Sequence, residues 1–251
     1  MKISKYNKII SANWKMNGSL SLIDEFEKYF KASYKHNISN AIIIFPPAPY
    51  FQQFSQILKN YQNIYFGSQN CSEFDNSART GEISASIIND IGCEFVILGH
   101  SERRSLFNED NSIISKKINI AIKNKLKVIL CIGENQEQKD NSDTFKIIEE
   151  QIITSSSKEC NPENTIIAYE PVWSIGSGKT PSIKEIEEIN KFIQEKLKLK
   201  FNIQTSKFKI IYGGSVNIKN FSNILQSNLI DGVLIGGSSL NIKDFIKISN
   251  F

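Results

Sequence analysis

Residues 164–197 read NTIIAYEPVWSIGSGKTPSIKEIEEINKFIQEKL and contain both patterns from which the fold is predicted. The stretch begins with an apolar run, 164–170, of the kind found in strands that are buried on both faces of a parallel sheet. Ser182 and Glu185 then form a capping-box pattern, which predicts the start of a helix. The apolar stripe of that helix recurs every three or four residues and consists of Ile183, Ile186, Ile189, Ile193 and Leu197.

The same alternation of a short apolar run and a helical pattern extends over the whole chain. Seven further runs occur, at 8–13, 41–46, 63–69, 94–99, 127–133, 209–214 and 231–237. Helical stripes between runs include Leu22, Phe26 and Phe30, and Phe145, Ile148 and Ile152. Eight strand–helix units in about 250 residues predict an α/β fold, a closed (β/α)8 barrel with a parallel eight-stranded core.

An open, doubly wound sheet is the alternative fold. The number of units and the lack of a G-x-G-x-x-G motif after the first run both count against it. No linker rich in glycine, serine or proline divides the chain, so residues 1–251 are expected to form a single domain.

Composition and charge argue against a nucleic-acid or membrane partner. The chain of 251 residues has 30 Lys and Arg against 26 Asp and Glu, and these charges are spread without a basic block. No nucleic-acid partner is therefore expected. The first 18 residues lack the apolar core of a signal peptide, and no run of 18 apolar residues exists, so we expect a cytoplasmic protein with no membrane partner.

Cysteine and histidine usage argues against a metal centre. The four cysteines, Cys71, Cys93, Cys131 and Cys160, form no C-x-x-C pair, and the chain has only two histidines. We therefore expect free thiols in a reducing compartment and no metal site.

The sequence GSGKT at 176–180 resembles the end of a nucleotide-binding P-loop. That motif needs a glycine five positions before its Gly-Lys pair, and here the position is occupied by Trp173. A bulky indole cannot form the tight backbone turn that holds the phosphates. The P-loop interpretation is therefore rejected.

Polar residues and glycines follow the predicted strands at the ends where the active site of such a barrel lies. They are Asn13 and Lys15, Gln69 and Asn70, His100, Ser101 and Glu102, Glu170, Gly213, Gly214 and Ser215, and Gly236 and Gly237. Singly, Lys15 would be a surface lysine, His100 a structural histidine, and Glu170 a partner of Arg103 or Arg104. Their shared position predicts a rim that gathers a lysine, an imidazole, a carboxylate and exposed peptide N–H groups.

Five segments carry a resemblance to a known family. ANWKMNG, GHSERR, AYEPVWSIGSGKT, YGGSV and GVLIGGSSL occur in this order, and together they resemble the triosephosphate isomerase family from about residue 10 to 245. The resemblance implies a TIM barrel that interconverts dihydroxyacetone phosphate and D-glyceraldehyde 3-phosphate by proton transfer through an enediol(ate). It implies a step in glycolysis and gluconeogenesis, and it implies no cofactor.

The resemblance also implies roles for the rim residues. Glu170 would be the base, because a desolvated carboxylate is a stronger base. His100 would polarise the substrate carbonyl as a neutral imidazole, and Lys15 would place a positive charge beside the enediolate and the phosphate. Asn13 would orient the substrate oxygens. Glu102 would either hold Lys15 in place or transfer a proton directly.

A lid and a phosphate site follow from the same resemblance. The lid would comprise Pro171, Val172, Trp173, Ser174, Ile175, Gly176, Ser177, Gly178 and Lys179. Its first hinge would be PVW, its second SGK, and its moving tip Ser174 to Gly176. The substrate phosphate would bind near Asn13 and Lys15 on backbone N–H groups of Gly176, Ser215, Gly236 and Gly237, where a side chain would block close approach.

The connection from about 70 to 82 is long for a loop between a strand and a helix. It resembles the loop by which family members enter a second subunit, with Thr80 at its tip against Asn13 of the partner subunit. The resemblance therefore implies a homodimer, and a solvent-exposed flexible loop is the alternative. The alternative functions are another phosphate-binding barrel, such as an aldolase or an indole-forming enzyme, and a catalytically silent phosphate-binding barrel or scaffold protein. The intact set of Lys15, His100 and Glu170 argues against both.

Overall fold

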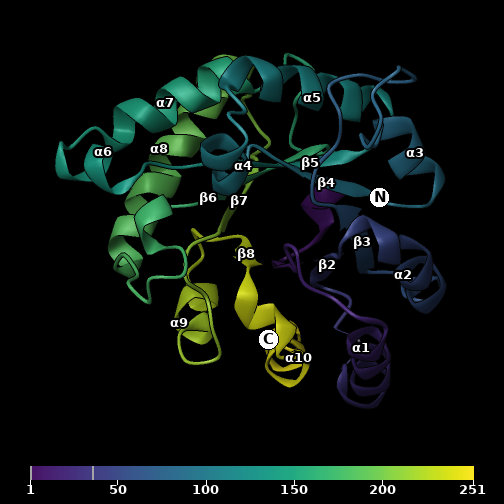
Figure 1. The fold of residues 1–251 in the computed structure, drawn as a ribbon. Coiled ribbons are helices and arrows are strands. Elements are labelled where there is room, and N and C mark those ends of the chain that lie inside the picture. The colour runs from purple at the N-terminus through teal and green to yellow at the C-terminus, as the bar shows by residue number, and fades with distance from the viewer. Residues whose placement is uncertain (1, 36) are drawn as a thin grey trace.

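The computed structural model describes residues 2–35 and 37–251, and its eight strands form a closed parallel barrel (Figure 1). The strands are β1 (Ile9–Asn13), β2 (Ala41–Phe45), β3 (Ile64–Ser68), β4 (Phe95–Leu98), β5 (Lys127–Ile132), β6 (Thr165–Tyr169), β7 (Lys209–Tyr212) and β8 (Gly232–Ile235). Each strand pairs with the next along the chain, and β1 pairs with β8. That closing pair confirms the predicted (β/α)8 barrel and excludes an open, doubly wound sheet.

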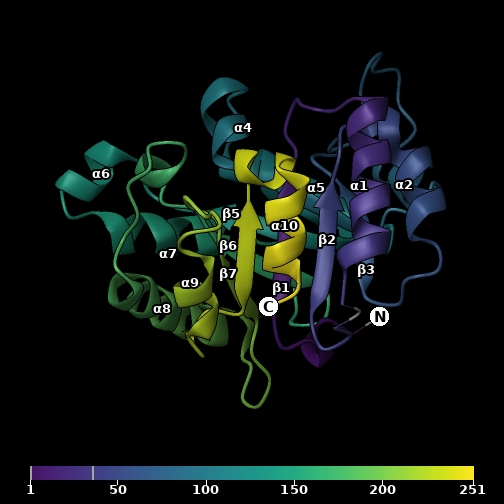
Figure 2. The same cartoon turned by 90° about the horizontal axis from the view of Figure 1, so that it is seen from below.

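Helices surround the barrel (Figures 1 and 2). They are α1 (Leu20–Ser33), α2 (Phe51–Leu58), α3 (Ala85–Asp90), α4 (Ser101–Leu106), α5 (Asn111–Lys123), α6 (Gln136–Asp140), α7 (Thr144–Ser155), α8 (Ile183–Phe201), α9 (Phe221–Gln226) and α10 (Ile242–Ser249). Short 3-10 helices are η1 (Ile3–Lys5), η2 (Ala48–Tyr50), η3 (Val172–Ser174) and η4 (Gly237–Leu240). In Figure 2, α10 lies in front of β1, between β8 and β2.

The strands are apolar along their whole length because each one contributes to two separate cores. Ile43 of β2 and Ile97 of β4 belong to a cluster that fills the barrel interior. Ile42 and Ile44, on either side of Ile43, belong to the layer between the barrel and the helices. Successive side chains of a strand point to opposite faces, so burial on both faces produces the near-continuous apolar runs.

The helix after β6 begins as the sequence predicts. Ser182 accepts a hydrogen bond from the N–H of Glu185, and the Glu185 side chain accepts one from the N–H of Ser182. Four residues of the predicted stripe are buried, namely Ile186, Ile189, Ile193 and Leu197. Because α8 packs against the barrel and begins just after residue 179, it fixes the position of the C-terminal end of the 171–179 segment.

The predicted stripe of α7 is only partly correct. Ile148 and Ile152 are fully buried, whereas Phe145 is 40 % exposed. Phe145 lies in the first turn of α7, and its ring packs against Phe192 of α8 with the centroids 4.8 Å apart. It covers the outside of the helix layer and does not enter the core.

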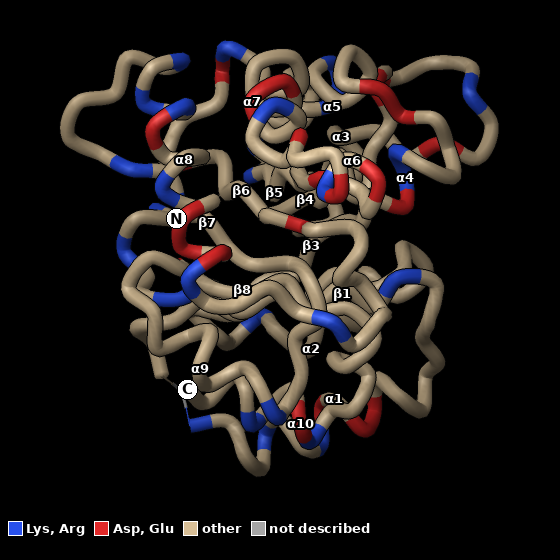
Figure 3. The backbone as a smooth tube through the Cα atoms, turned by 90° about the vertical axis from the view of Figure 1, so that its left-hand side faces the viewer, with Lys and Arg blue, Asp and Glu red and all other residues tan. Residues whose placement is uncertain are grey.

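The structure also shows how charged residues, apolar helices and possible metal ligands are distributed. Lys and Arg are interspersed with Asp and Glu around the barrel in Figure 3. Among residues 2–35 and 37–251, no helix has both the length and the apolar character needed to cross a membrane. Within the same residues, no group of three or more His, Cys, Asp or Glu side chains is arranged to hold a metal ion. All four cysteines are buried as free thiols.

Candidate active site

A cavity of about 200 Å³ lies at the carboxyl ends of the strands. Its volume is below the roughly 300–1,000 Å³ of sites for drug-sized ligands, so it suits a small molecule. The predicted residues that line it are Asn13, Lys15, His100, Glu170, Gly176, Ser215, Gly236 and Gly237. Gly213, Gly214, Ile175, Val216, Leu234 and Ser238 also line it. Glu102 and Thr80 lie outside this lining.

The imidazole of His100 is held in one tautomer. His100 is the N-cap of α4, and its Nδ1 accepts a hydrogen bond from the N–H of Glu102 at 3.2 Å. An accepting nitrogen carries no proton, so the proton of the neutral ring lies on Nε2. That Nε2 is 3.3 Å from Oε1 of Glu170. The ring therefore presents an N–H donor to the cavity.

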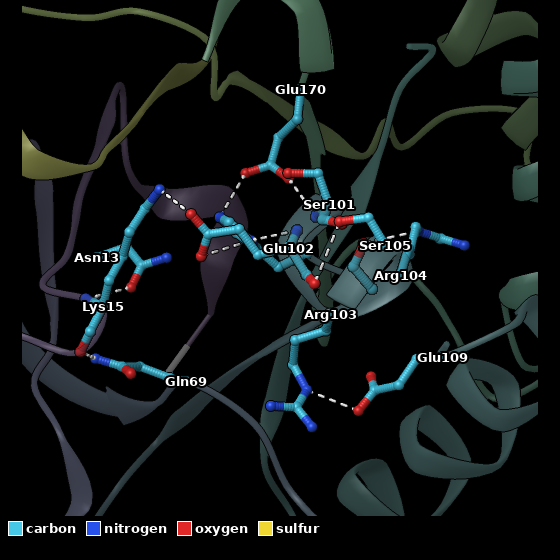
Figure 4. Close-up of polar contacts among 12 residues, drawn as sticks. Asn13, Lys15, Gln69, Ser101, Glu102, Arg103, Arg104, Ser105, Glu109 and Glu170 are labelled. Atoms are coloured by element: carbon cyan, nitrogen blue, oxygen red, sulfur yellow. Dashed lines mark hydrogen bonds and ion pairs between the residues drawn. The ribbon is translucent and has the colours of Figure 1, made fainter. Parts of the chain in front are cut away.

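Glu170 follows β6 directly and is 2 % exposed. Its Oε2 accepts a hydrogen bond from the N–H of Ser101 at 3.3 Å (Figure 4). A Cβ at Gly213 would lie 2.7 Å from Cγ of Glu170, so only glycine leaves room for this side chain. The carboxylate is thus buried, positioned by the first turn of α4 and directed at the cavity.

The arginines next to the site direct their hydrogen bonds to groups other than this carboxylate. Nε of Arg103 donates to Glu109 at 2.7 Å, and Nη1 of Arg104 donates to Asn111 at 2.6 Å. In the part of the chain that the structure describes, neither arginine forms an ion pair with Glu170. The alternative explanation of Glu170 as a simple arginine partner is therefore wrong.

Lys15 occupies a strained backbone conformation with φ of 53°. Both peptide groups of Lys15 are hydrogen-bonded. Oδ1 of Asn13 accepts a hydrogen bond from the Lys15 N–H at 3.0 Å, and Nε2 of Gln69 donates one to the Lys15 carbonyl at 2.8 Å. Lys15 Nζ pairs with Oε1 of Glu102, as Figure 4 shows. Strain of this kind persists only where the surroundings fix it, as happens at functional sites.

Glycines after β8 line the cavity next to Lys15. Gly236 and Gly237 lie where β8 ends and η4 begins, and no side chain caps the start of that helix. A Cβ at Gly236 would lie 3.4 Å from Cε of Lys15, so the glycine leaves the lysine close to this wall. Unpaired N–H groups at the start of a helix attract anions.

The lid segment 171–179 has one buried and one exposed part. Ser174 is 0 % exposed, whereas Gly176 to Lys179 lie on the surface. Within the expected tip, Ser174 to Gly176, the Ser174 side chain packs inward and Gly176 lies on the surface. Gly176 and Gly178 have φ of 68° and 75°, values that favour glycine.

The first hinge of the lid is anchored by Glu134, a residue that our sequence analysis missed. Nε1 of Trp173 donates to Glu134 Oε1 at 2.8 Å, and the N–H of Val172 donates to the Glu134 carbonyl at 2.9 Å. Lys139 Nζ lies 3.2 Å from the Trp173 ring centroid. Glu134 follows the fifth apolar run much as Glu170 follows the sixth, so the rule that found Glu170 could have found it.

Burial of Glu134 predicts that its contribution to stability depends on pH. It is 1 % exposed, and burial raises its pKa above the usual 4.5, against the opposing effect of its bond from Trp173. A raised carboxyl pKa means that the folded state binds more protons than the unfolded state, so this group lowers stability as pH rises above about 4.5. Glu134→Gln stays neutral, so its Tm minus that of wild type should increase from pH 4 to pH 7. A constant or falling difference in thermal melts would contradict this.

The connection between β3 and α3 is a structured loop. The N–H of Ser72 donates to the carbonyl of Ile83 at 2.9 Å, and Lys117 Nζ donates to Oδ1 of Asn70 at 2.9 Å. The guanidinium of Arg79 lies 3.7 Å from the centroid of the Phe74 ring. Thr80 is exposed beside it.

Comparisons with known proteins agree on one family. The family model described as triosephosphate isomerase matches residues 8–251. The triosephosphate isomerase of Buchnera aphidicola subsp. Schizaphis graminum is 42 % identical over 244 residues, 96 % of each chain. That of Shewanella sp. strain MR-4 is 36 % identical over 248 residues, 96 % of this chain and 95 % of the relative. The crystal structure of triosephosphate isomerase from Bartonella henselae aligns with a TM-score of 0.86 at 32 % identity, covering 96 % of this chain and 97 % of that one.

Proposed function

Because the chain belongs to the triosephosphate isomerase family and interconverts dihydroxyacetone phosphate and D-glyceraldehyde 3-phosphate, we propose that Lys15, His100 and Glu170 carry the proton transfers. The reaction is an isomerisation and a step of glycolysis. One observation supports the assignment above others: an ammonium, an imidazole N–H and a buried carboxylate, from β1, β4 and β6, line one small cavity.

The reaction moves one proton between adjacent carbons. The Glu170 carboxylate takes a proton from the carbon next to the substrate carbonyl and returns it to the former carbonyl carbon. The bond from the Ser101 N–H holds one carboxylate oxygen, which leaves Oε1 on the side of His100. The carboxylate is 2 % exposed, so its neighbours are protein groups, the Ser101 N–H and the His100 ring, and not bulk water.

The negative charge of the enediolate needs donors. Nε2 of His100 donates its proton toward the carbonyl oxygen and moves protons between the two substrate oxygens. Lys15 supplies a positive charge that is already in place, since its turn is fixed by Asn13 and Gln69. Asn13 uses its Oδ1 for that turn, so its NH₂ group is the part it offers to a substrate oxygen.

Glu102 is proposed to hold Lys15. The ion pair is partly open to solvent, with the lysine side chain 26 % and the glutamate side chain 43 % exposed. The glutamate thus limits where the ammonium can lie without closing it off from the substrate. Its exclusion from the cavity lining favours this role over direct proton transfer.

The substrate phosphate is proposed to bind the N–H groups of Gly176, Ser215, Gly236 and Gly237. These residues share the wall of the cavity next to Lys15, and glycines let a phosphate approach the backbone closely. Gly176 comes from the lid, so a lid that closes on the phosphate also excludes water. Exclusion of water protects the enediolate, which readily eliminates a neighbouring phosphate.

The direct test is a coupled assay with D-glyceraldehyde 3-phosphate, run beside variants of Glu170 and Lys15. Isomerisation is expected for the wild-type chain, and inorganic phosphate is expected to compete with substrate. If a variant that lacks either side chain turned over substrate as fast as wild type, the role assigned to that side chain would be wrong.

We propose that the active protein is a homodimer. Large apolar side chains lie exposed around the segments that follow β1, β3 and β4: Met16 (97 %), Ile87 (56 %), Leu106 (72 %) and Phe107 (62 %). We propose that a second copy of the chain covers these exposed side chains. The ordered loop with Thr80 is proposed to reach Asn13 of the partner subunit.

The dimer proposal predicts an effect of one exposed position. Met16→Lys should shift the mass of the particle toward the 28.5 kDa of one chain in light scattering, because a charge would be buried in the interface. Ile38→Lys is the matched control, since Ile38 is 68 % exposed but precedes β2 at the other end of the barrel. A monomeric wild-type protein with full activity would contradict the proposal.

The domain organisation and the cellular location of the protein are also proposed. Residues 1–251 are proposed to act as one domain, because pairing of β1 with β8 joins the two ends of the chain in one barrel. A cytoplasmic location is supported by the four buried free thiols, which suit a reducing compartment. Proteolysis that released a stable fragment would argue against the first, and cell fractionation tests the second.

A further inference from the structure

The hydroxyl of Ser174 lies where three parts of the site meet. It donates to the carbonyl of Lys179 at 2.6 Å, which joins the two ends of the lid segment. Its Oγ lies 3.2 Å from the Tyr212 hydroxyl at the end of β7. The N–H of Ser215 donates to it at 3.3 Å. One buried side chain thus connects the lid with the turn that follows β7.

These three contacts use the whole bonding capacity of the hydroxyl. A serine hydroxyl has one proton to donate and two lone pairs that accept. The carbonyl of Lys179 can only accept, so it takes the proton of Ser174. The Tyr212 hydroxyl and the Ser215 N–H must then both be donors to Ser174. Burial raises the pKa of Tyr212 to about 12, which keeps its proton available for this bond.

The surrounding backbone is shaped for this arrangement. A Cβ at Gly214 would lie 2.2 Å from the Tyr212 hydroxyl oxygen and 2.9 Å from Oγ of Ser174. Any other residue at this position would push the two hydroxyls apart. The glycine therefore permits the contact between lid and turn as well as access to the cavity.

Two acceptors compete for the Ser215 N–H, the Ser174 hydroxyl and the proposed substrate phosphate. The proposed phosphate site needs this donor, yet the N–H donates to the hydroxyl of Ser174 at 3.3 Å. We infer that Ser174 is a positioning residue whose hydroxyl occupies the Ser215 N–H until the substrate phosphate replaces it, while the contact with Tyr212 keeps the lid next to the end of β7. This inference rests on the proposed phosphate site at Ser215.

The bond between Ser174 and the Ser215 N–H should weaken the affinity of the site for phosphate. Phosphate binding must break the bond between Ser215 and Ser174, and it leaves one lone pair of a buried hydroxyl without its donor. Removal of the hydroxyl removes that cost. Ser174→Ala should therefore bind phosphate more tightly, although loss of the bond to Lys179 loosens the lid and lowers kcat.

Ser177 offers a matched control in the same lid. Its hydroxyl donates to the carbonyl of Ser174 at 3.1 Å and accepts from the N–H of Lys179 at 3.1 Å. Both bonds stay inside the lid and neither reaches Ser215. Ser177→Ala thus alters the lid by one hydroxyl without changing the donor that the phosphate needs.

The experiment measures inorganic phosphate as a competitive inhibitor of D-glyceraldehyde 3-phosphate in wild type, Ser174→Ala and Ser177→Ala. Ser174→Ala should lower the inhibition constant by about two- to tenfold, the worth of one neutral hydrogen bond, while kcat falls. Ser177→Ala should keep the inhibition constant within about twofold of wild type, since no bond to phosphate is changed. Thermal melts check that both variants are folded.

The outcomes separate the two proposals. Competition in the wild type with an unchanged or raised inhibition constant in folded Ser174→Ala would overturn the role of Ser174 and leave the phosphate site intact. An equal decrease in both variants would show a general effect of the lid and would also overturn it. Absence of competition in the wild type would overturn the phosphate site and the inference together.

If Ser174→Ala does not fold, Ser174→Gly and the amide of Ser215 provide the test. Hydrogen exchange of that amide in the wild type should be slow without ligand and should stay slow with inorganic phosphate, because one acceptor replaces the other. Fast exchange without ligand would overturn the inference, since the hydroxyl of Ser174 would then not hold the N–H.

Discussion

Glu170→Asp is expected to lower kcat by about 100-fold or more, with KM changed by less than about threefold. The shorter side chain withdraws the carboxylate by about one methylene from the carbon that it must deprotonate, and a misplacement of about 1 Å costs roughly that factor. Binding should survive because the phosphate contacts are made elsewhere. Steady-state kinetics in both directions measure the split between kcat and KM.

Glu170→Gln is the companion variant. It keeps the length of the side chain and its contact with the Ser101 N–H, but it cannot accept a proton from carbon. A loss of about 10⁴-fold, larger than that of Glu170→Asp, is expected for the loss of a general base. A Gln variant more active than the Asp variant would mean that Glu170 positions the substrate and is not the base.

Lys15→Ala is expected to reduce kcat/KM by about 1,000-fold or more. One fixed donor at a developing oxyanion contributes about 10²–10³-fold, and Lys15 also lies next to the proposed phosphate wall. Both kcat and KM should therefore be affected, unlike in Glu170→Asp. Activity near that of wild type would exclude the electrostatic role.

Glu102→Gln controls for the ion pair. This change removes the charge that holds Lys15 but leaves the ammonium in the site. If Glu102 only positions Lys15, we expect a loss of about tenfold, the scale of one charge-assisted hydrogen bond. A loss as large as that of Lys15→Ala would instead favour direct proton transfer by Glu102.

The local sequence was sufficient for the elements of the fold. All eight apolar runs contain strands, and the capping box at Ser182 starts α8 where it was expected. Such features depend on neighbours along the chain, which the sequence displays directly. Phe145 was misassigned because a helical stripe does not say how far from the core its first turn lies.

The grouping of the rim residues also followed from sequence, since parallel strands in a barrel bring their carboxyl ends to one rim. Asn13, Lys15, His100 and Glu170 could be placed together in this way, as could the glycines after β7 and β8. Glu134 was missed only because the residue after the fifth run was not considered. The sequence could not indicate that Ser174 turns inward.

The sequence by itself thus determined which elements form, in what order, and which side chains share the rim, because periodicity, caps and strand ends are local properties of the chain. Only the tertiary structure decided which distant atoms pair: the Lys15 ammonium with Glu102, and the Ser174 hydroxyl with Ser215. A hydrogen bond requires its two atoms within about 3.5 Å, and residues that are 41 or 87 positions apart reach that distance only when the barrel closes.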